Sequence, residues 1–152
     1  MITVIAKLDK SSRARLSWIQ SFAASFGIVP RPIYGHITIC ELEADKIESV
    51  KASLAGRKAF SVDFTGVEVL REEKMIAALA TREGALEDIH DKLCPGTDWV
   101  PHTELLRDNV MDLGWVRSAM AGMFQAFTAT ISRIEFMDGT NVIDGMDLEE
   151  TV

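Results

Sequence analysis

The sequence predicts an α+β fold made of two similar halves, each with the element order βαβαβ. Three observations predict it. Short β-branched apolar runs alternate with segments of helical periodicity, the alternation occurs twice along the chain, and the strand after the first helix of each half carries a histidine, His36 or His102. Two halves related by a pseudo-two-fold axis would bring these equivalent strands together around a central cleft.

The first half begins with an apolar strand, followed by a helix that Ser11 or Ser12 can cap and that Gly27 ends. Two prolines then predict an extended linker before the histidine strand. A second helix and a third strand complete the half. The three strands and the second helix are expected over residues 2–8, 34–41, 60–70 and 45–55.

The second half is predicted to repeat this order. A short charged link at 71–73 indicates a hairpin into its first strand, and Asp108 or Asn109 can cap its second helix, which runs to about Met123. An Asp138–Gly139 turn ends its last strand, with a short acidic strand or tail after it. The expected strands and first helix cover residues 74–81, 100–106, 126–136 and 84–93.

Length and composition predict one domain over residues 1–152, with two pseudo-symmetric lobes of about 1–81 and 82–152. No run approaches the ~20 apolar residues of a membrane-spanning helix, and no signal peptide is expected. The two cysteines, Cys40 and Cys94, form no CxxC pattern. Free thiols in a reducing cytoplasm are therefore expected.

Charge argues against binding of long nucleic acids. The net charge is −7, and six of the 23 acidic residues follow Arg133, which leaves 17 acidic against 16 basic residues before them. A nearly neutral body offers no broad basic face for many phosphates. A small phosphate ligand held by one or two cations remains possible.

Strand alternation predicts which side chains share the histidine faces. In YGHITICE (34–41), Tyr34, Thr38 and Cys40 share the face of His36, while the isoleucines form the core face. In the second strand, Glu104 and Leu106 share the face of His102, and Thr103 and Leu105 oppose it.

Two segments resemble motifs of the two-histidine (2H) phosphoesterase superfamily, which includes 2′-5′ RNA ligase-like proteins and cyclic phosphodiesterases. GHITI (35–39) resembles its first HxTx motif, and WVPHTELLR (99–107) resembles its second, W-x-PH-x-T-L-x-R. The residues of this chain that match the second motif are Trp99, Pro101, His102, Leu105 and Arg107. With its duplicated layout, the resemblance covers nearly the whole chain.

The resemblance implies antiparallel sheets around a central cleft, with the helices outside, and a phosphodiesterase acting on 2′,3′-cyclic or 2′-5′ linkages of small nucleotides or RNA ends. His36 and His102 would be acid and base, with reactive nitrogens roughly 6–8 Å apart. Thr38 would donate a hydrogen bond to the phosphate. No cofactor or metal is implied, and no membrane partner is expected.

One position departs from the motif. Where the superfamily has Thr or Ser two residues after the second histidine, this chain has Glu104, and Thr103 comes one residue early. A carboxylate about 5 Å from a phosphate would repel it by roughly 3 kcal/mol, or on the order of a hundredfold in rate. Three outcomes stay open: a β-bulge at 102–104 turns Thr103 inward and Glu104 outward, Glu104 stays inside and orients His102, or the phosphodiester chemistry is lost.

Other residues have two interpretations each. Arg107 can clamp a phosphate or form a surface ion pair, and Tyr34 can stack on a base or pack at the rim, as can Trp99. Arg31 is most simply a loop residue. Cys40 is more simply a buried cysteine than a nucleophile, and His90 is expected to be structural.

Three functions follow as hypotheses. The first is the phosphodiesterase, or the reverse ligase. The second is a non-catalytic domain that binds a nucleotide or another small ligand on the same scaffold, because the second motif is altered at Glu104. The third is a different enzyme that uses His36, Cys40 or Glu104.

Overall fold

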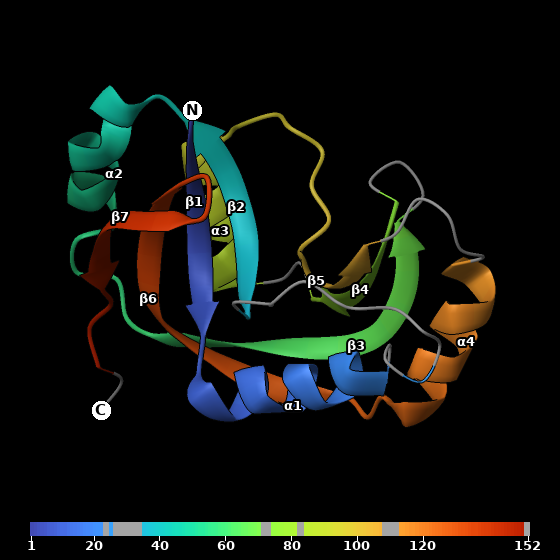
Figure 1. Cartoon of the computed structure of the whole chain (residues 1–152). Coiled ribbons are helices and arrows are strands. Elements are labelled where there is room, and N and C mark those ends of the chain that lie inside the picture. Colours follow the sequence, from blue (N-terminus) through green and yellow to red (C-terminus); the bar gives the residue numbers. More distant parts are fainter. Residues whose placement is uncertain (23–24, 26–34, 71–73, 82–83, 108–112, 151–152) are drawn as a thin grey trace.

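The computed structural model describes residues 1–22, 25, 35–70, 74–81, 84–107 and 113–150. Within them the chain forms seven strands and four helices (Figure 1). The strands are β1 (Ile2–Leu8), β2 (His36–Leu42), β3 (Phe60–Leu70), β4 (Met75–Ala80), β5 (His102–Arg107), β6 (Phe127–Asp138) and β7 (Asn141–Asp147). The helices are α1 (Lys10–Ser21), α2 (Ile47–Leu54), α3 (Ala85–Leu93) and α4 (Leu113–Met123), with a short 3₁₀ helix (Ala44–Lys46) before α2.

The predicted order of two βαβαβ halves is confirmed, with β7 as the added acidic strand after the turn at Gly139. The predicted cap of α1 is wrong. Asp9 caps the helix, because its carboxylate accepts hydrogen bonds from the backbone N–H (3.2 Å) and the hydroxyl (2.7 Å) of Ser12, which lies inside the helix. The predicted end of this helix at Gly27, the link at 71–73 and the cap at Asp108 or Asn109 lie outside the described residues.

All strands pair antiparallel in one sheet of order β2-β1-β6-β3-β4-β5, with β7 on β6. The order is symmetric, since exchanging β1 with β4, β2 with β5 and β3 with β6 reverses it. This is the pseudo-two-fold arrangement expected of the duplicated halves. The sheet is continuous rather than divided in two because the first part of β6 pairs with β3 over Phe60–Phe64.

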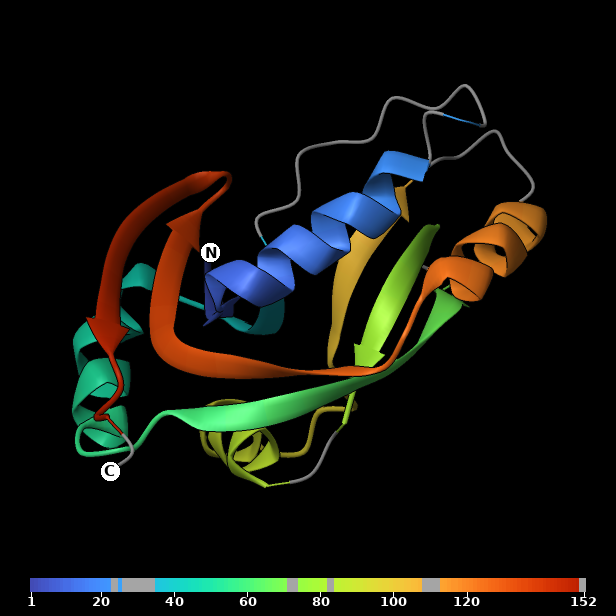
Figure 2. The same cartoon turned by 90° about the horizontal axis from the view of Figure 1, so that it is seen from below.

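The long strands β3 and β6 shape the molecule. Figure 2 shows β6 bending sharply between its pairing with β3 and its pairing with β1 and β7, and α1 and α3 lie on opposite sides of β3. The histidine strands β2 and β5 are the two ends of the strand order, yet β2 and β5 come into contact. None of the helices in the described ranges is long and apolar enough to cross a membrane.

Apolar alternation fixes which face of β2 is buried. Ile37 and Ile39 are 0% and 2% exposed and join the core, together with Val4 of β1 and Phe136 of β6. Each buried side chain of this size contributes roughly 1.5–3 kcal/mol, and a one-residue slip would move the whole set into water. This core therefore holds His36 and Thr38 on the opposite face.

Candidate active site

The polar face of β2 continues across its neighbours. His36 pairs with Lys7 of β1, and Thr38 pairs with Ile5, which in turn pairs with Glu135 of β6. Directly paired residues of antiparallel strands lie on the same face with their Cβ atoms about 5 Å apart. His36 and Thr38 therefore share one surface with Lys7 and Glu135.

Cys40 does not lie on this face, contrary to the prediction. The pairing shifts between Val4 and Ile5 of β1, so that Ile39 is an extra residue in β2 and Cys40 pairs with Val4. Cys40 is 8% exposed and belongs to the core. Burial and the contact with Cys94 raise the pKa of the Cys40 thiol, which argues against a thiolate nucleophile beside His36.

His102 opens β5 and is half-buried. Its Nδ1 lies 2.7 Å from the carbonyl oxygen of Val100. Because a carbonyl can only accept, Nδ1 carries the proton in this bond, and Nε2 is the nitrogen left for chemistry. The local backbone thus fixes both the tautomer and the ring orientation of His102.

Glu104 stays on the His102 face. Thr103 between them is 3% exposed and pairs with the buried Ala78, so the expected substrate contact through Thr103 is corrected to a core position. The irregularity in β5 lies after Glu104, where Leu105 is the extra residue opposite Ile76 and Ala77. A bulge that turns Glu104 outward is therefore not what the chain forms.

Arg107 neutralises part of the charge at Glu104. Its Nε donates a 2.9 Å hydrogen bond to Oε1 of Glu104. The bulge explains this contact, because the extra residue places both Leu105 and Leu106 in the core, at 0% and 2% exposure, and returns Arg107 to the face of Glu104. Leu106 was expected on the His102 face, and the same bulge corrects that expectation.

Charged side chains of β5 affect the pKa of His36 on β2. Burial lowers the pKa of His36 below its ordinary value of 6.5, and the His102 charge lowers it further, while the carboxylates of Glu104 and Glu135 act in the opposite direction. The strands that carry these residues, β2 and β5, are in contact. His36, His102 and Glu104 are therefore brought together from two ends of the strand order.

Trp99 joins the two strands physically. Its indole Nε1 donates a 3.0 Å hydrogen bond to the carbonyl oxygen of Thr38. The other side of this contact is His90 of α3, whose ring stacks on that of Trp99 with centroids 4.3 Å apart and planes 3° apart. His90 is 2% exposed and also bonds to Thr97 and Asp91. It is a structural residue, as expected, and Trp99 packs rather than offering its face to a base.

Tyr34, an expected substrate contact, and Arg31, expected to be a loop residue, lie outside the described residues. In the part of the chain that the structure describes, no group of three or more His, Cys, Asp and Glu side chains is placed to hold a metal ion.

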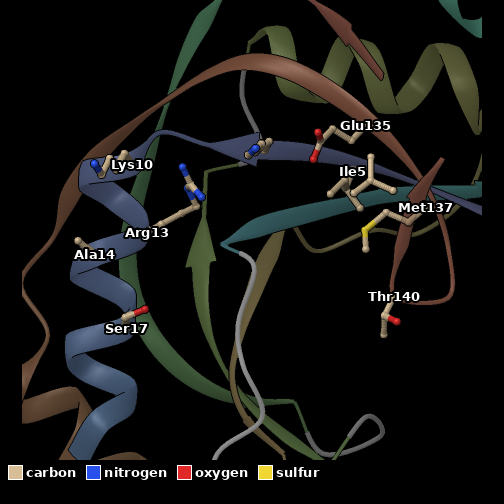
Figure 3. A pocket seen from close by; sticks show the side chains of 10 residues that line it. Ile5, Lys10, Arg13, Ala14, Ser17, Glu135, Met137 and Thr140 are labelled. Atoms are coloured by element: carbon tan, nitrogen blue, oxygen red, sulfur yellow. The ribbon is translucent and has the colours of Figure 1, made fainter. Parts of the chain in front are cut away.

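A basic pocket beside His36 was missed by the sequence analysis. It has a volume of about 480 Å³, lies between α1, β1 and the β6–β7 hairpin, and is lined by Lys7, Lys10 and Arg13 among others (Figure 3). One signal was available: Lys7 is the single charged residue of an otherwise apolar strand. The spacing of Lys10 and Arg13, one helical turn apart, also places them on one side of α1.

No protein-family model matches the sequence, and no curated protein matches it. Solved structures do match over almost the full length. TT0787 of Thermus thermophilus is 14% identical, with a TM-score of 0.65 and 98% of both chains covered. E. coli LigT in complex with 3′-AMP is 15% identical, with a TM-score of 0.62 and 97% of both chains covered. Kluyveromyces marxianus Usb1 is 14% identical, with a TM-score of 0.56 and 97% of both chains covered.

At these identities the likeness shows the fold. The predicted LigT-like fold is confirmed by these matches. The described residues of this chain form an α+β fold like that of LigT, with both histidine strands in the symmetric places that the paired motifs predicted.

Proposed function

We propose that the chain is a phosphodiesterase that acts on 2′,3′-cyclic or 2′-5′ linkages of small nucleotides or RNA ends by acid–base catalysis between His36 and His102. The observation that carries the proposal is that the two histidine strands, from opposite ends of the strand order, come into contact, and the charge of His102 acts on the pKa of His36. LigT has been crystallised with 3′-AMP and with ATP, which supports a small nucleotide as the ligand class.

His36 is the proposed base. A base must be unprotonated when the substrate binds, and burial lowers the pKa of His36, so the ring is neutral at neutral pH. In hydrolysis of a cyclic phosphate, His36 takes a proton from water as the water oxygen forms its bond to phosphorus. The bond from phosphorus to the 2′ or 3′ oxygen breaks on the opposite side.

His102 is the proposed acid. Its Nδ1 is occupied by the carbonyl of Val100, so Nε2 delivers the proton to the leaving ribose oxygen. The products are a phosphate monoester and a free hydroxyl, and the two histidines have exchanged protonation states. With the 5′-hydroxyl of a second nucleotide in place of water, the same steps open the cyclic phosphate and form a phosphodiester, as a ligase would.

Thr38 is the proposed phosphate donor. It lies on the His36 face of β2, and its hydroxyl would hydrogen-bond a non-bridging oxygen, where charge builds up in the transition state. On the opposite strand Glu104 takes the place of the second hydroxyl. The Arg107 guanidinium bonded to that carboxylate offsets part of its repulsion of phosphate.

The experiment is hydrolysis of nucleoside 2′,3′-cyclic phosphates and 2′-5′-linked dinucleotides by the wild type, His36→Ala and His102→Ala. Loss of either histidine should lower kcat/KM by about 10²–10⁴-fold, the usual contribution of a general acid or base. The double variant, purified in parallel, measures any contaminating activity. Equal rates for the wild type and His36→Ala, with both proteins folded by circular dichroism, would reject the proposal.

A second function, a non-catalytic nucleotide-binding domain, is favoured by one observation: the Glu104 carboxylate remains on the His102 face. It predicts binding of 3′-AMP without turnover of any cyclic nucleotide. Glu104→Thr, which restores the motif hydroxyl, should then create activity where the wild type has none. If the phosphodiesterase proposal holds, the wild type already turns over, and Glu104→Thr raises the rate instead.

The proposal includes a cytoplasmic location. The free thiols of Cys40 and Cys94 support a reducing compartment.

A further inference from the structure

The basic pocket beside the histidine face is formed by two elements that are adjacent in sequence. Lys7 comes from β1, and Lys10 and Arg13 come from the first turns of α1. Figure 3 shows Arg13 projecting from the helix toward the strands, with Glu135 and Met137 on the other side of the space and Thr140 at the hairpin. Three cationic groups thus line one pocket of about 480 Å³.

Within the described part of the chain, the charges of these three side chains do not stabilise the fold through ion pairs. Among the described residues, Lys7, Lys10 and Arg13 form no ion pair, and the buried Nε of Arg13 has no hydrogen-bond partner. Like charges that outnumber the nearby counter-charges repel one another, and a buried guanidinium N–H without an acceptor is costly. An anion in the pocket would relieve both.

The one carboxylate among these lining residues, Glu135, supplies only part of that counter-charge. Glu135 lines the same space, but its Oε2 accepts a 3.0 Å hydrogen bond from Nε of Arg133, which does not line the pocket. Arg133 also bonds to Asp147 through Nη1 at 2.8 Å, so its charge is shared between two carboxylates. Glu135 is thus one carboxylate against the three cations that line the pocket. The pocket keeps an excess of positive charge in a chain whose net charge is −7.

The pocket adjoins His36 through two contacts. Lys7 is the direct cross-strand partner of His36. The side-chain stem of Arg13 lies on Gly35, so closely that a Cβ at Gly35 would lie 2.1 Å from Cγ of Arg13. An anion held by Lys7, Lys10 and Arg13 would therefore lie on the same surface as a phosphate held between the two histidines.

We infer that this pocket is a subsite for a second phosphate of the substrate, one nucleoside unit away from the phosphate that reacts. The inference rests on the proposed function and narrows its substrate class to nucleotides with at least two phosphate groups. The second phosphate is either a terminal 5′-phosphate on the reacting nucleoside or the next internal phosphodiester of an RNA end.

Equilibrium binding of product analogues to the full chain tests the inference without requiring turnover. The ligands are adenosine 3′-monophosphate, adenosine 3′,5′-bisphosphate and an adenylyl dinucleotide with a 3′-phosphate. We expect the bisphosphate, the dinucleotide or both to bind at least tenfold more tightly than the monophosphate. Whichever ligand shows the gain identifies the source of the second phosphate.

Two variants and a matched control test whether the pocket causes the tighter binding of ligands with two phosphates. Arg13→Gln and Lys10→Met should reduce the ratio of the two affinities to below two. Lys10 is exposed, so its substitution tests the pocket even if loss of the Arg13 stem disturbs the fold. Arg15→Gln removes a cation from the same helix that lies over the ring of Phe127 instead, and it should keep the tenfold ratio.

The outcomes separate this inference from the proposed function. Equal affinity of the wild type for all three ligands, or a ratio that survives both substitutions, overturns the subsite, whether or not cyclic nucleotides are hydrolysed. A tenfold ratio that both substitutions abolish supports the subsite, even in a protein that proves to bind without turnover.

Discussion

The indole N–H of Trp99 donates a 3.0 Å hydrogen bond to the carbonyl oxygen of Thr38, 61 residues earlier in the chain. The bond links the segment before β5 to the middle of β2, and each of these strands carries one of the two histidines. Since β2 and β5 stand at opposite ends of the strand order, no ladder of backbone hydrogen bonds joins them directly. The Trp99 bond therefore helps to set the distance between the two imidazoles.

Trp99→Phe should weaken this link while keeping an aromatic ring against His90. Loss of one hydrogen bond predicts a fall in the free energy of unfolding of about 1 kcal/mol, measured by urea denaturation. The fall in kcat/KM should be larger, on the order of tenfold or more, because a small displacement of catalytic groups is costly. The matched control is Trp115→Phe at a side chain that is 61% exposed. Similar losses of activity in both variants would contradict the assigned role.

Gly35→Ala should destabilise the chain through two effects at one position. Gly35 has φ = +61°, where a side chain costs roughly 1–2 kcal/mol, and the new Cβ would meet Cγ of Arg13 at 2.1 Å. We expect a loss of at least ~2 kcal/mol in the free energy of unfolding, together with displacement of Arg13. Gly122→Ala in α4 meets nothing within 4 Å and should leave stability equal or slightly raised. Equal effects in the two variants would count against this account.

Asp9→Ala should remove the cap of α1 and a tertiary contact at once. The carboxylate also accepts a 2.9 Å hydrogen bond from the backbone N–H of Thr130 in β6. A loss of about 1–2 kcal/mol is expected at pH 7, and Asp9→Asn, which keeps an acceptor oxygen, should recover most of it.

The effect of Asp9 should depend on pH. Burial alone would raise the pKa of Asp9, but the hydrogen bonds from Ser12 and Thr130 outweigh it and hold this pKa below 3.8. The stability that the ionised carboxylate adds is therefore complete above about pH 4 and is lost as the pH falls through the folded-state pKa. The difference between the wild type and Asp9→Ala in thermal unfolding should shrink at low pH, and a difference that grew would contradict the argument.

The faces of the histidine strands show how far a sequence can predict a site. Alternation with Ile37 and Ile39 placed His36 and Thr38 correctly, because that pattern is fixed by burial against one core. The same rule failed for Cys40 and Leu106. Each follows an extra residue in its strand. Neither bulge contains a glycine or proline that would mark it in the sequence, because its position is set by the register against the neighbouring strand.

Contacts between residues of different strands and helices could not be predicted from the sequence, for a different reason. The symmetric order of elements predicted that the histidine strands would meet, and β2 and β5 are in contact. The pairing of His36 with Lys7 and the packing of Arg13 on Gly35 depend on how β1 and α1 are set against β2. No spacing within a single segment carries that information, so the basic pocket was visible only once the strands were assembled.

Glu104→Gln should move the acid limb of the pH profile. In kcat/KM this limb reports protonation of the free enzyme's base, proposed to be His36, whose pKa burial lowers below 6.5 although the Glu104 carboxylate acts to raise it. Activity should therefore fall only as the pH drops below 6.5. Removal of the carboxylate takes away a charge that favours the imidazolium, so the limb of Glu104→Gln should lie at a lower pH than that of the wild type. The exposed Glu150→Gln variant should leave the limb in place, and a shift of Glu104→Gln toward higher pH would show that His36 is not the base.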